Sequence, residues 1–143
     1  MGDEIAMLAR ALDGALCDAD FAAIPRGLSS RYWENVAEAA EVIEAAAAHA
    51  ARAPMPDAER AKSLALVTSL VPALVDALAQ PRAEHDDRVE CVQVSLNAIE
   101  TLLSAGAELD ALDRLLPLLP QLASPPALLG PLAALLKVLA VHP

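Results

Sequence analysis

The chain is short of aromatic residues, glycine and cysteine. Only 2% of its 143 residues are aromatic, so its hydrophobic content of 56% consists mainly of Ala, Leu and Val. Five glycines and few β-branched residues besides Val disfavour a sheet, whereas Ala and Leu favour closely spaced helices. The length is sufficient for one domain with a real core. We therefore expect a single all-α domain.

The two cysteines, Cys17 and Cys91, are too few for a disulfide framework, which agrees with a reducing cytoplasm. Both lie among apolar neighbours, so we expect buried thiols. Pro, Asp or Lys interrupts the apolar stretches before about 18 residues, and we expect no membrane span. The acidic start Met1-Gly2-Asp3-Glu4 argues against a signal peptide. These features together predict a cytoplasmic protein.

Positive charge is scarce as well, with 10 Lys and Arg against 20 Asp and Glu and a net charge of −10. Nucleic acids and anionic membranes attract clustered Lys and Arg, so neither is expected as a partner. An acidic surface is compatible with a basic protein partner. The acidic ridge, defined as Glu34, Glu38, Glu41 and Glu44, is either solvated or a contact for such a partner.

Motifs for catalysis are missing. The sequence has no glycine-rich phosphate loop, no Gly-x-Ser-x-Gly and no zinc-ligand spacing, so we expect no enzyme, no cofactor and no metal. The run Glu84-His85-Asp86-Asp87 contains metal-ligand types, but without the twelve-residue calcium pattern. A solvated loop that caps the next helix is the other interpretation of this run, and the one we favour.

Hydrophobic periodicity divides the chain into an N-terminal helix and linker, 1–27, and a helical-repeat domain, 28–143. Within 1–27 we expect a helix to about residue 17 and a linker over 18–27, because Pro25 and Gly27 interrupt the pattern. Apolar stripes then predict five further helices, over 29–52, 57–81, 87–105, 108–122 and 127–141. We expect a kink before Pro72 in the second of these and an end at Gly106 for the third. Pro117 and Pro120 should break the fourth, and Gly130-Pro131 should interrupt the fifth.

Part of this pattern occurs twice. The segment 70–81 returns as 115–126 with Pro72 aligned to Pro117, and the helix before each copy also aligns, with Ile43 on Ile99 and Glu44 on Glu100. Period alone aligns any two Ala- and Leu-rich amphipathic helices, but the repeated proline placement is less expected by chance. Repeated helix pairs are typical of α-solenoids, which offer surfaces for binding other proteins.

The segment Ser69-Leu70-Val71-Pro72-Ala73-Leu74-Val75 resembles the helix-opening segment of armadillo repeats. The stretch 87–106, with its acidic cap, apolar stripe and terminal Gly106, is similar to the helix that follows in that family, and HEAT repeats share much of the pattern. The resemblance implies an armadillo/HEAT-like right-handed α-solenoid of about five or six helices and a role in protein binding.

The predicted function is that of a non-catalytic protein–protein interaction module, a scaffold or adaptor. One alternative is a domain that forms a homodimer through the Leu-rich last helix, which is apolar on more than one side; another is a helical bundle that binds a small ligand. Trp33 either contacts a partner protein or is buried in the core, where it anchors its helix. The candidate contact residues are Arg31, Tyr32, Trp33, Gln93, Asn97, Glu100, Leu132 and Leu136.

Overall fold

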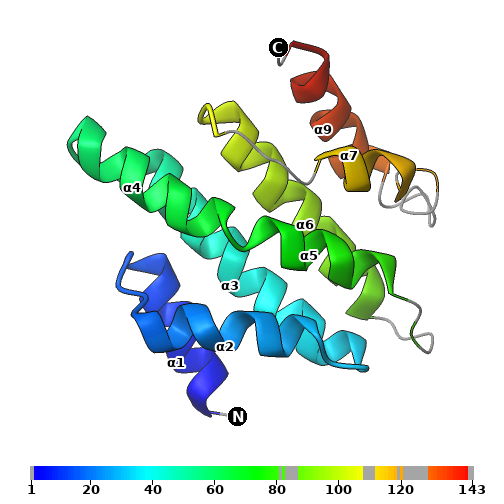
Figure 1. Cartoon of the computed structure of the whole chain (residues 1–143), viewed down its shortest axis with the longest axis horizontal. Helices are drawn as coiled ribbons and strands as arrows, with labels where there is room; N and C mark the ends of the chain where they lie inside the picture. The colour runs from blue at the N-terminus through cyan, green and yellow to red at the C-terminus, as the bar shows by residue number, and fades with distance from the viewer. Residues whose placement is uncertain are drawn as a thin grey trace.

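The computed structural model describes residues 2–80, 82, 87–107, 112–118, 120 and 129–141, and every regular element in this part of the chain is a helix (Figure 1). The expectation of an all-α protein is confirmed. Residues 84–86 of the predicted loop before the helix at 87–105 lie outside the described residues.

Two long helices, α3 (Trp33–Arg52) and α6 (Asp87–Ser104), pack against each other and form the centre of the fold (Figure 1). Their predicted apolar stripes are confirmed, since Ile43 on α3 and Ile99 on α6 are both fully buried. The contact face of α3 is rich in alanine, whose small side chain lets another backbone approach closely. The buried alanines of α3 are Ala37, Ala39, Ala40, Ala45, Ala46, Ala47 and Ala50.

The other helices cover this pair. The helices α1 (Gly2–Leu12), α2 (Asp18–Leu28) and α4 (Asp57–Thr68) pack on α3, whereas α9 (Leu129–Val141) packs on α6. The short α5 (Val71–Ala79) contacts α2, α6 and α7 (Leu112–Leu115), and α7 continues into the 3₁₀ turn η1 (Leu116–Leu118). Figure 1 shows α4 and α5 in front of α3 and α6, with α9 beside α6 at the C-terminal end.

The predicted linker over 18–27 is wrong, because this segment forms most of α2. Pro25 lies inside the helix, where a missing N–H and a clash with the preceding turn cost about 3 kcal/mol. Burial of Ile24 and Leu28, at 2% and 1% exposure, offsets this cost, since each such side chain contributes about 1.5–3 kcal/mol.

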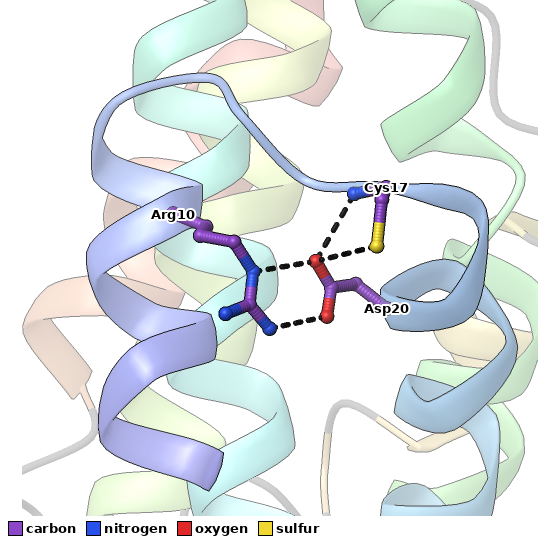
Figure 2. A network of polar contacts seen from close by, with 3 residues as sticks. All are labelled: Arg10, Cys17 and Asp20. Carbon is purple, nitrogen blue, oxygen red and sulfur yellow. Dashed lines mark hydrogen bonds and ion pairs between the residues drawn. The ribbon is translucent and has the colours of Figure 1, made fainter.

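A partly buried ion pair between Arg10 and Asp20 fixes the turn between α1 and α2 (Figure 2). Asp20, 4% exposed, accepts hydrogen bonds from Arg10 Nε at 2.8 Å and Nη2 at 2.6 Å, and from the backbone N–H of Cys17 at 3.0 Å. The hydrogen bonds from Arg10 hold the pKa of Asp20 far below its usual range. Cys17 donates its thiol to the same carboxylate at 3.4 Å and is exposed, so the expectation that both thiols are buried holds only for Cys91.

Glycines with positive φ end two of the helices. Gly106, at φ 93°, ends α6 as predicted, with the N–H of Ala107 donating to the carbonyl of Leu102 at 3.0 Å. Gly14, at φ 69°, ends α1 in the same way, through a 2.7 Å bond from Ala15 N–H to Arg10 O. The first helix therefore ends at Leu12 and not near residue 17 as predicted.

The long helix α3 begins at Trp33, later than the predicted start at Ser29 or Ser30. Ser30 instead holds the turn before it, because its hydroxyl oxygen accepts a hydrogen bond from the N–H of Tyr32 at 3.1 Å. The predicted end at Arg52 is confirmed. Arg60 of α4 donates to the carbonyls of Ala50 and Ala53 at 2.9 and 2.7 Å, which satisfies acceptors at this end.

Pro72 divides the segment 57–79 as predicted. The first helix ends at Thr68 and the second begins at Val71, where the absent N–H of Pro72 would in any case lack an intrahelical partner. Contrary to our expectation, 57–79 has the length and apolar composition of a membrane-crossing helix, a criterion that core helices of soluble proteins also meet. Its buried members include Val67, Leu70 and Leu74.

The last helix is continuous, so the predicted interruption at Gly130-Pro131 is wrong. Both residues lie in the first turn of α9, where backbone N–H groups have no intrahelical acceptor to lose. The break at Pro117 is confirmed, because α7 ends at Leu115 and passes into a 3₁₀ turn.

Candidate functional site

The acidic ridge of α3 is not uniformly solvated. Glu34 is exposed, but Glu38, Glu41 and Glu44 are half-buried. The last two of these line a groove of about 650 Å³ between α1, α3 and α6, which we call the acidic groove. Its lining residues are Leu8, Leu12, Glu41, Glu44, Ala45, Ala48, Arg52, Glu90, Val94, Asn97, Glu100 and Thr101.

Helical periodicity explains how the walls of the acidic groove form. On α3 the lining positions lie three, four, seven and eleven residues after Glu41, which is one face of an α-helix. On α6 they lie four, seven, ten and eleven residues after Glu90, which is again one face of the helix. Because each face combines small or apolar residues with carboxylates, the two helices pack closely and keep acidic groups at their shared edge. The third helix, α1, contributes only apolar side chains to the lining, Leu8 and Leu12.

Two carboxyl groups in the groove, those of Glu41 and Glu44, have raised pKa values. The pKa of Glu41 is raised to about 7, first by burial, then by a hydrogen bond with Glu90 and by the charges of Glu90, Glu38 and Glu44. Burial also raises the pKa of Glu44, although a hydrogen bond from Asn97 and the charge of Arg52 act in the opposite direction. Carboxyl groups with raised pKa in a concave site are typical of binding sites.

The structure brings together only some of the predicted contact residues. Asn97 and Glu100 lie in the acidic groove, whereas Gln93, on the same helix, is exposed outside its lining. Glu41 and Glu90 are the important residues that our candidate set lacks. Glu41 belongs to the acidic ridge, and Asn97 lies seven residues after Glu90, a spacing that places both on one face of α6. That spacing could have indicated that Glu90 shares a face with Asn97. The sequence of α6 does not show that α1 and α3 partly cover this face.

The predicted aromatic contact divides into a core residue and a surface residue. Trp33 is 5% exposed and anchors α3 in the core, beneath the guanidinium of Arg82 at 4.8 Å from the ring centre. Tyr32 is 56% exposed, and Arg31 lies over its ring at 5.9 Å. Of this group, Tyr32 and Arg31 therefore remain available for contact with a partner.

The apolar last helix is also divided. Leu132 is buried at 7% exposure, whereas Leu136 is 47% exposed. These two residues contribute nothing to the acidic groove. Only Leu136 of the pair is available for the predicted dimer contact.

Metal ligands do not gather in the described part of the chain. No group of three or more His, Cys, Asp or Glu side chains there has the arrangement of a metal site. His49 is half-buried on α3 and lies against Gly14, while His85 and His142 lie outside the described residues. Of the candidate run 84–87, only Asp87 is described, and it begins α6.

No protein-family model, curated protein or solved structure matches the chain. The armadillo/HEAT resemblance therefore stays a prediction from the residues that carry it.

Proposed function

We propose that this chain is a non-catalytic protein–protein interaction module, a scaffold or adaptor, and that its acidic groove binds a Lys- or Arg-rich segment of a partner protein. The observation that carries the proposal is a groove of about 650 Å³ with carboxylates on two helices, Glu41 and Glu44 on α3 and Glu90 and Glu100 on α6. A cationic side chain that enters it meets acceptors from both walls.

The chemistry of the groove favours long basic side chains. A guanidinium group forms paired hydrogen bonds with a carboxylate, and these charge-assisted bonds are stronger than neutral ones. The apolar lining at Leu8, Leu12 and Val94 suits the aliphatic stems of Lys and Arg. The net charge of −10 attracts a basic partner over longer distances and speeds association at low salt.

A small organic cation is the second candidate ligand. The groove volume lies within the range of about 300–1,000 Å³ that is typical of small-molecule sites. Convergent polar groups, with Asn97 and Thr101 beside the carboxylates, also fit such a site. This ligand corresponds to the helical bundle with a small-ligand site that the sequence left as an alternative.

The helical-repeat arrangement belongs to the same proposal. The recurrence of the pattern around Pro72 and Pro117, and the alignment of Ile43 with Ile99 on the two central helices, support an armadillo/HEAT-like right-handed solenoid. A cytoplasmic location agrees with the low cysteine content. Dimer formation through α9 is the alternative mode of association, supported by the exposed Leu136.

Binding of fluorescein-labelled octa-arginine, followed by anisotropy at low and physiological salt, tests the proposal. We expect Glu44→Gln with Glu100→Gln to weaken binding by about tenfold or more, because two acceptors of the groove are lost. The matched control is Glu34→Gln with Glu59→Gln, which removes the same charge from two exposed positions on α3 and α4. This control is expected to change affinity by less than about threefold.

Equal weakening by both pairs of substitutions would mean that octa-arginine responds only to the overall charge, and would overturn the groove as the peptide site.

Spermidine is the probe for the second candidate ligand, a small organic cation. Spermidine binding that is lost in the groove variant, together with no binding of octa-arginine, would favour the small cation over the protein segment.

A further inference from the structure

A second groove, which we call the hairpin groove, lies between α1, α2 and α3. Its lining positions fall within 23–30 on α2 and the following turn and within 35–42 on α3, together with Met7 of α1. The volume is about 480 Å³, inside the range of about 300–1,000 Å³ that is typical of small-molecule sites. The hairpin groove shares no lining residue with the acidic groove, so the two are separate sites.

The hairpin groove has an apolar end. The helices α2 and α3 pack together and are joined by the short turn 29–32, so they run antiparallel. Gly27 allows their close approach, because a Cβ at this position would lie 3.2 Å from the Cβ of Ala39. Ile24 lies about one turn before Gly27, and Val42 about one turn after Ala39, and both are buried. These two side chains therefore give the groove an apolar floor at the end away from the turn.

The end of the groove near the turn is polar. The hydroxyl oxygen of Ser30 accepts hydrogen bonds from the N–H of Tyr32 at 3.1 Å and from Nδ2 of Asn35 at 2.9 Å. A hydroxyl group has two acceptor lone pairs and one O–H donor, so Ser30 keeps its donor. In the described part of the chain, neither the O–H of Ser30 nor the side-chain oxygen of Asn35 has a hydrogen-bond partner. This end thus offers one donor and one acceptor to a ligand.

Two opposite charges line the groove between its polar and apolar ends. Arg26 precedes Gly27 on α2 and is exposed, and its guanidinium has no hydrogen bond or ion pair within the described residues. It lies in the last turn of α2, where the helix dipole stabilises a cation without a carboxylate partner. Glu38 precedes Ala39 on α3 and is half-buried. A carboxylate has about four acceptor sites, so Glu38 can accept from a ligand in addition to its contacts within the protein.

This distribution of charge selects among classes of ligand. A basic molecule meets the positive charge of Arg26, and an acidic one meets Glu38 and the net charge of −10. A purely apolar molecule gains nothing from either group. A molecule with an ammonium and a carboxylate group on one carbon, and an apolar side chain on the same carbon, matches the two charges and the apolar floor together.

We propose that the hairpin groove binds a free α-amino acid with an apolar side chain. The carboxylate pairs with the guanidinium of Arg26 and accepts from the Ser30 hydroxyl, while the ammonium group donates to Glu38 and to the side-chain oxygen of Asn35. The apolar side chain lies against Ile24, Val42 and Met7. This binding activity goes beyond the recognition of a partner protein and does not depend on the acidic groove.

Isothermal titration calorimetry of the full chain with L-leucine, L-methionine and L-phenylalanine tests the proposal. We expect at least one of them to bind with a Kd below about 1 mM. Two analogues of leucine then separate the charges, because 4-methylpentanoate lacks the ammonium group and 3-methylbutylamine lacks the carboxylate. For a protein that binds leucine, each analogue should bind about tenfold more weakly or worse.

Two results of the calorimetry would overturn the proposal. One is that none of the three amino acids binds with a Kd below about 1 mM. The other is that 4-methylpentanoate binds as tightly as leucine, which would show that Glu38 does not recognise an ammonium group. The groove would then be a site for carboxylates, such as the C-terminus of a partner protein.

Variants at the two charged positions test their separate roles. We expect Arg26→Gln and Glu38→Gln each to weaken binding of the amino acid about tenfold, since each removes one charge-assisted contact. The matched controls are Arg31→Gln and Glu34→Gln, which change the same charges at exposed positions outside the lining and should alter affinity less than about twofold. Arg26 is exposed, so Arg26→Gln still provides the test if Glu38→Gln folds poorly. Equal effects in Arg26→Gln and Arg31→Gln would contradict the site.

Methyl ¹H–¹³C spectra of the wild-type protein locate the ligand. We expect the signals of Ile24 and Val42 to shift as the amino acid is added, and the signals of Val94 in the acidic groove to stay unchanged. Shifts at Val94 without shifts at Ile24 and Val42 would place the ligand in the acidic groove and overturn the assignment to the hairpin groove.

Discussion

The guanidinium of Arg82 stacks on Trp33, 4.8 Å from the ring centre, and donates to the carbonyls of Leu28 and Ser30 at 3.1 and 2.8 Å. A further hydrogen bond reaches the carbonyl of Ala77 at the end of α5. One side chain thus joins the end of α2, the start of α3 and the end of α5. The planar fork of arginine suits this arrangement, because several donors act while the flat face covers the indole.

We expect Arg82→Ala to lower the free energy of unfolding by about 2–4 kcal/mol, from the lost cation–π contact and the carbonyls left without donors. Arg82→Lys is expected to recover less than half of this loss, since an ammonium group lacks the fork. Urea denaturation measures both. Arg31→Ala is the control, because Arg31 is exposed and its described contact is with the face of Tyr32. If Arg31→Ala lowered the free energy of unfolding as much as Arg82→Ala, the structural role given to Arg82 would be contradicted.

Gly14→Ala tests the contact between the end of α1 and α3. A Cβ on Gly14 would lie 2.2 Å from Cε1 of His49, and its φ of 69° is unfavourable for alanine. We expect a loss of about 2–4 kcal/mol, part from the backbone and part from the clash. Gly106→Ala is the matched control, since φ is also positive but a Cβ would meet nothing within 4 Å, and it should lose only about 1–2 kcal/mol.

The double variant Gly14→Ala with His49→Ala separates the two causes. Removal of the imidazole ring gives the new methyl group space, so the second substitution should cost less in the Gly14→Ala background than in wild type. Thermal denaturation of the four proteins provides this cycle. Additive losses would show that His49 does not limit the position of Gly14.

The pH dependence of stability has two limbs of opposite sign. Asp20 has a lowered pKa in the folded protein, so its contribution is present above its unfolded value of 3.8 and is lost as the pH falls below that value. Glu41 has a raised pKa, so its contribution is complete below its unfolded value of 4.5 and is lost as the pH rises through about 7. We therefore expect maximum stability between about pH 4 and 5.

The magnitude of the alkaline limb follows from Glu41. The shift from 4.5 to about 7 sets an upper limit near 3 kcal/mol, and partial exposure reduces the expected loss between pH 5 and pH 8 to about 1–2 kcal/mol. Urea denaturation across pH 3–9 measures it, with Glu41→Gln as the variant that should flatten this limb. Stability that rises from pH 5 to pH 8 would contradict the environment assigned to Glu41.

Two adjacent leucines on α9 allow the packing of this helix in the core and its role in dimer formation to be tested separately. Leu135 is fully buried against the core, so Leu135→Ala should cost about 2–4 kcal/mol, whereas the exposed Leu136 should tolerate alanine with a loss below about 1 kcal/mol. Light scattering on Leu136→Glu then tests dimer formation through α9. A wild-type dimer that becomes a folded monomer in this variant would support the self-associating alternative.

Trp33 and Leu132 show why candidate contacts were harder to predict than helices. Trp33 is a candidate because Trp is common at interface hot spots, and Leu132 because the last helix is apolar on more than one side, but both are buried. The same side chain serves a core or an interface equally well. Which use applies depends on whether other elements cover it, as Arg82 covers Trp33.

The sequence alone determined the all-α class, the apolar stripes of the two central helices, the division at Pro72 and the end of α6 at Gly106, because each depends on local periodicity or on the backbone of one residue. Only the tertiary structure decided the rest. The segment 18–28 is helical because the core buries Ile24 and Leu28, which outweighs the local cost of Pro25. The pKa of Glu41 is raised to about 7, first because the packed helices bury this carboxyl group and then because α6 places Glu90 near it, and neither neighbour is part of the local sequence pattern.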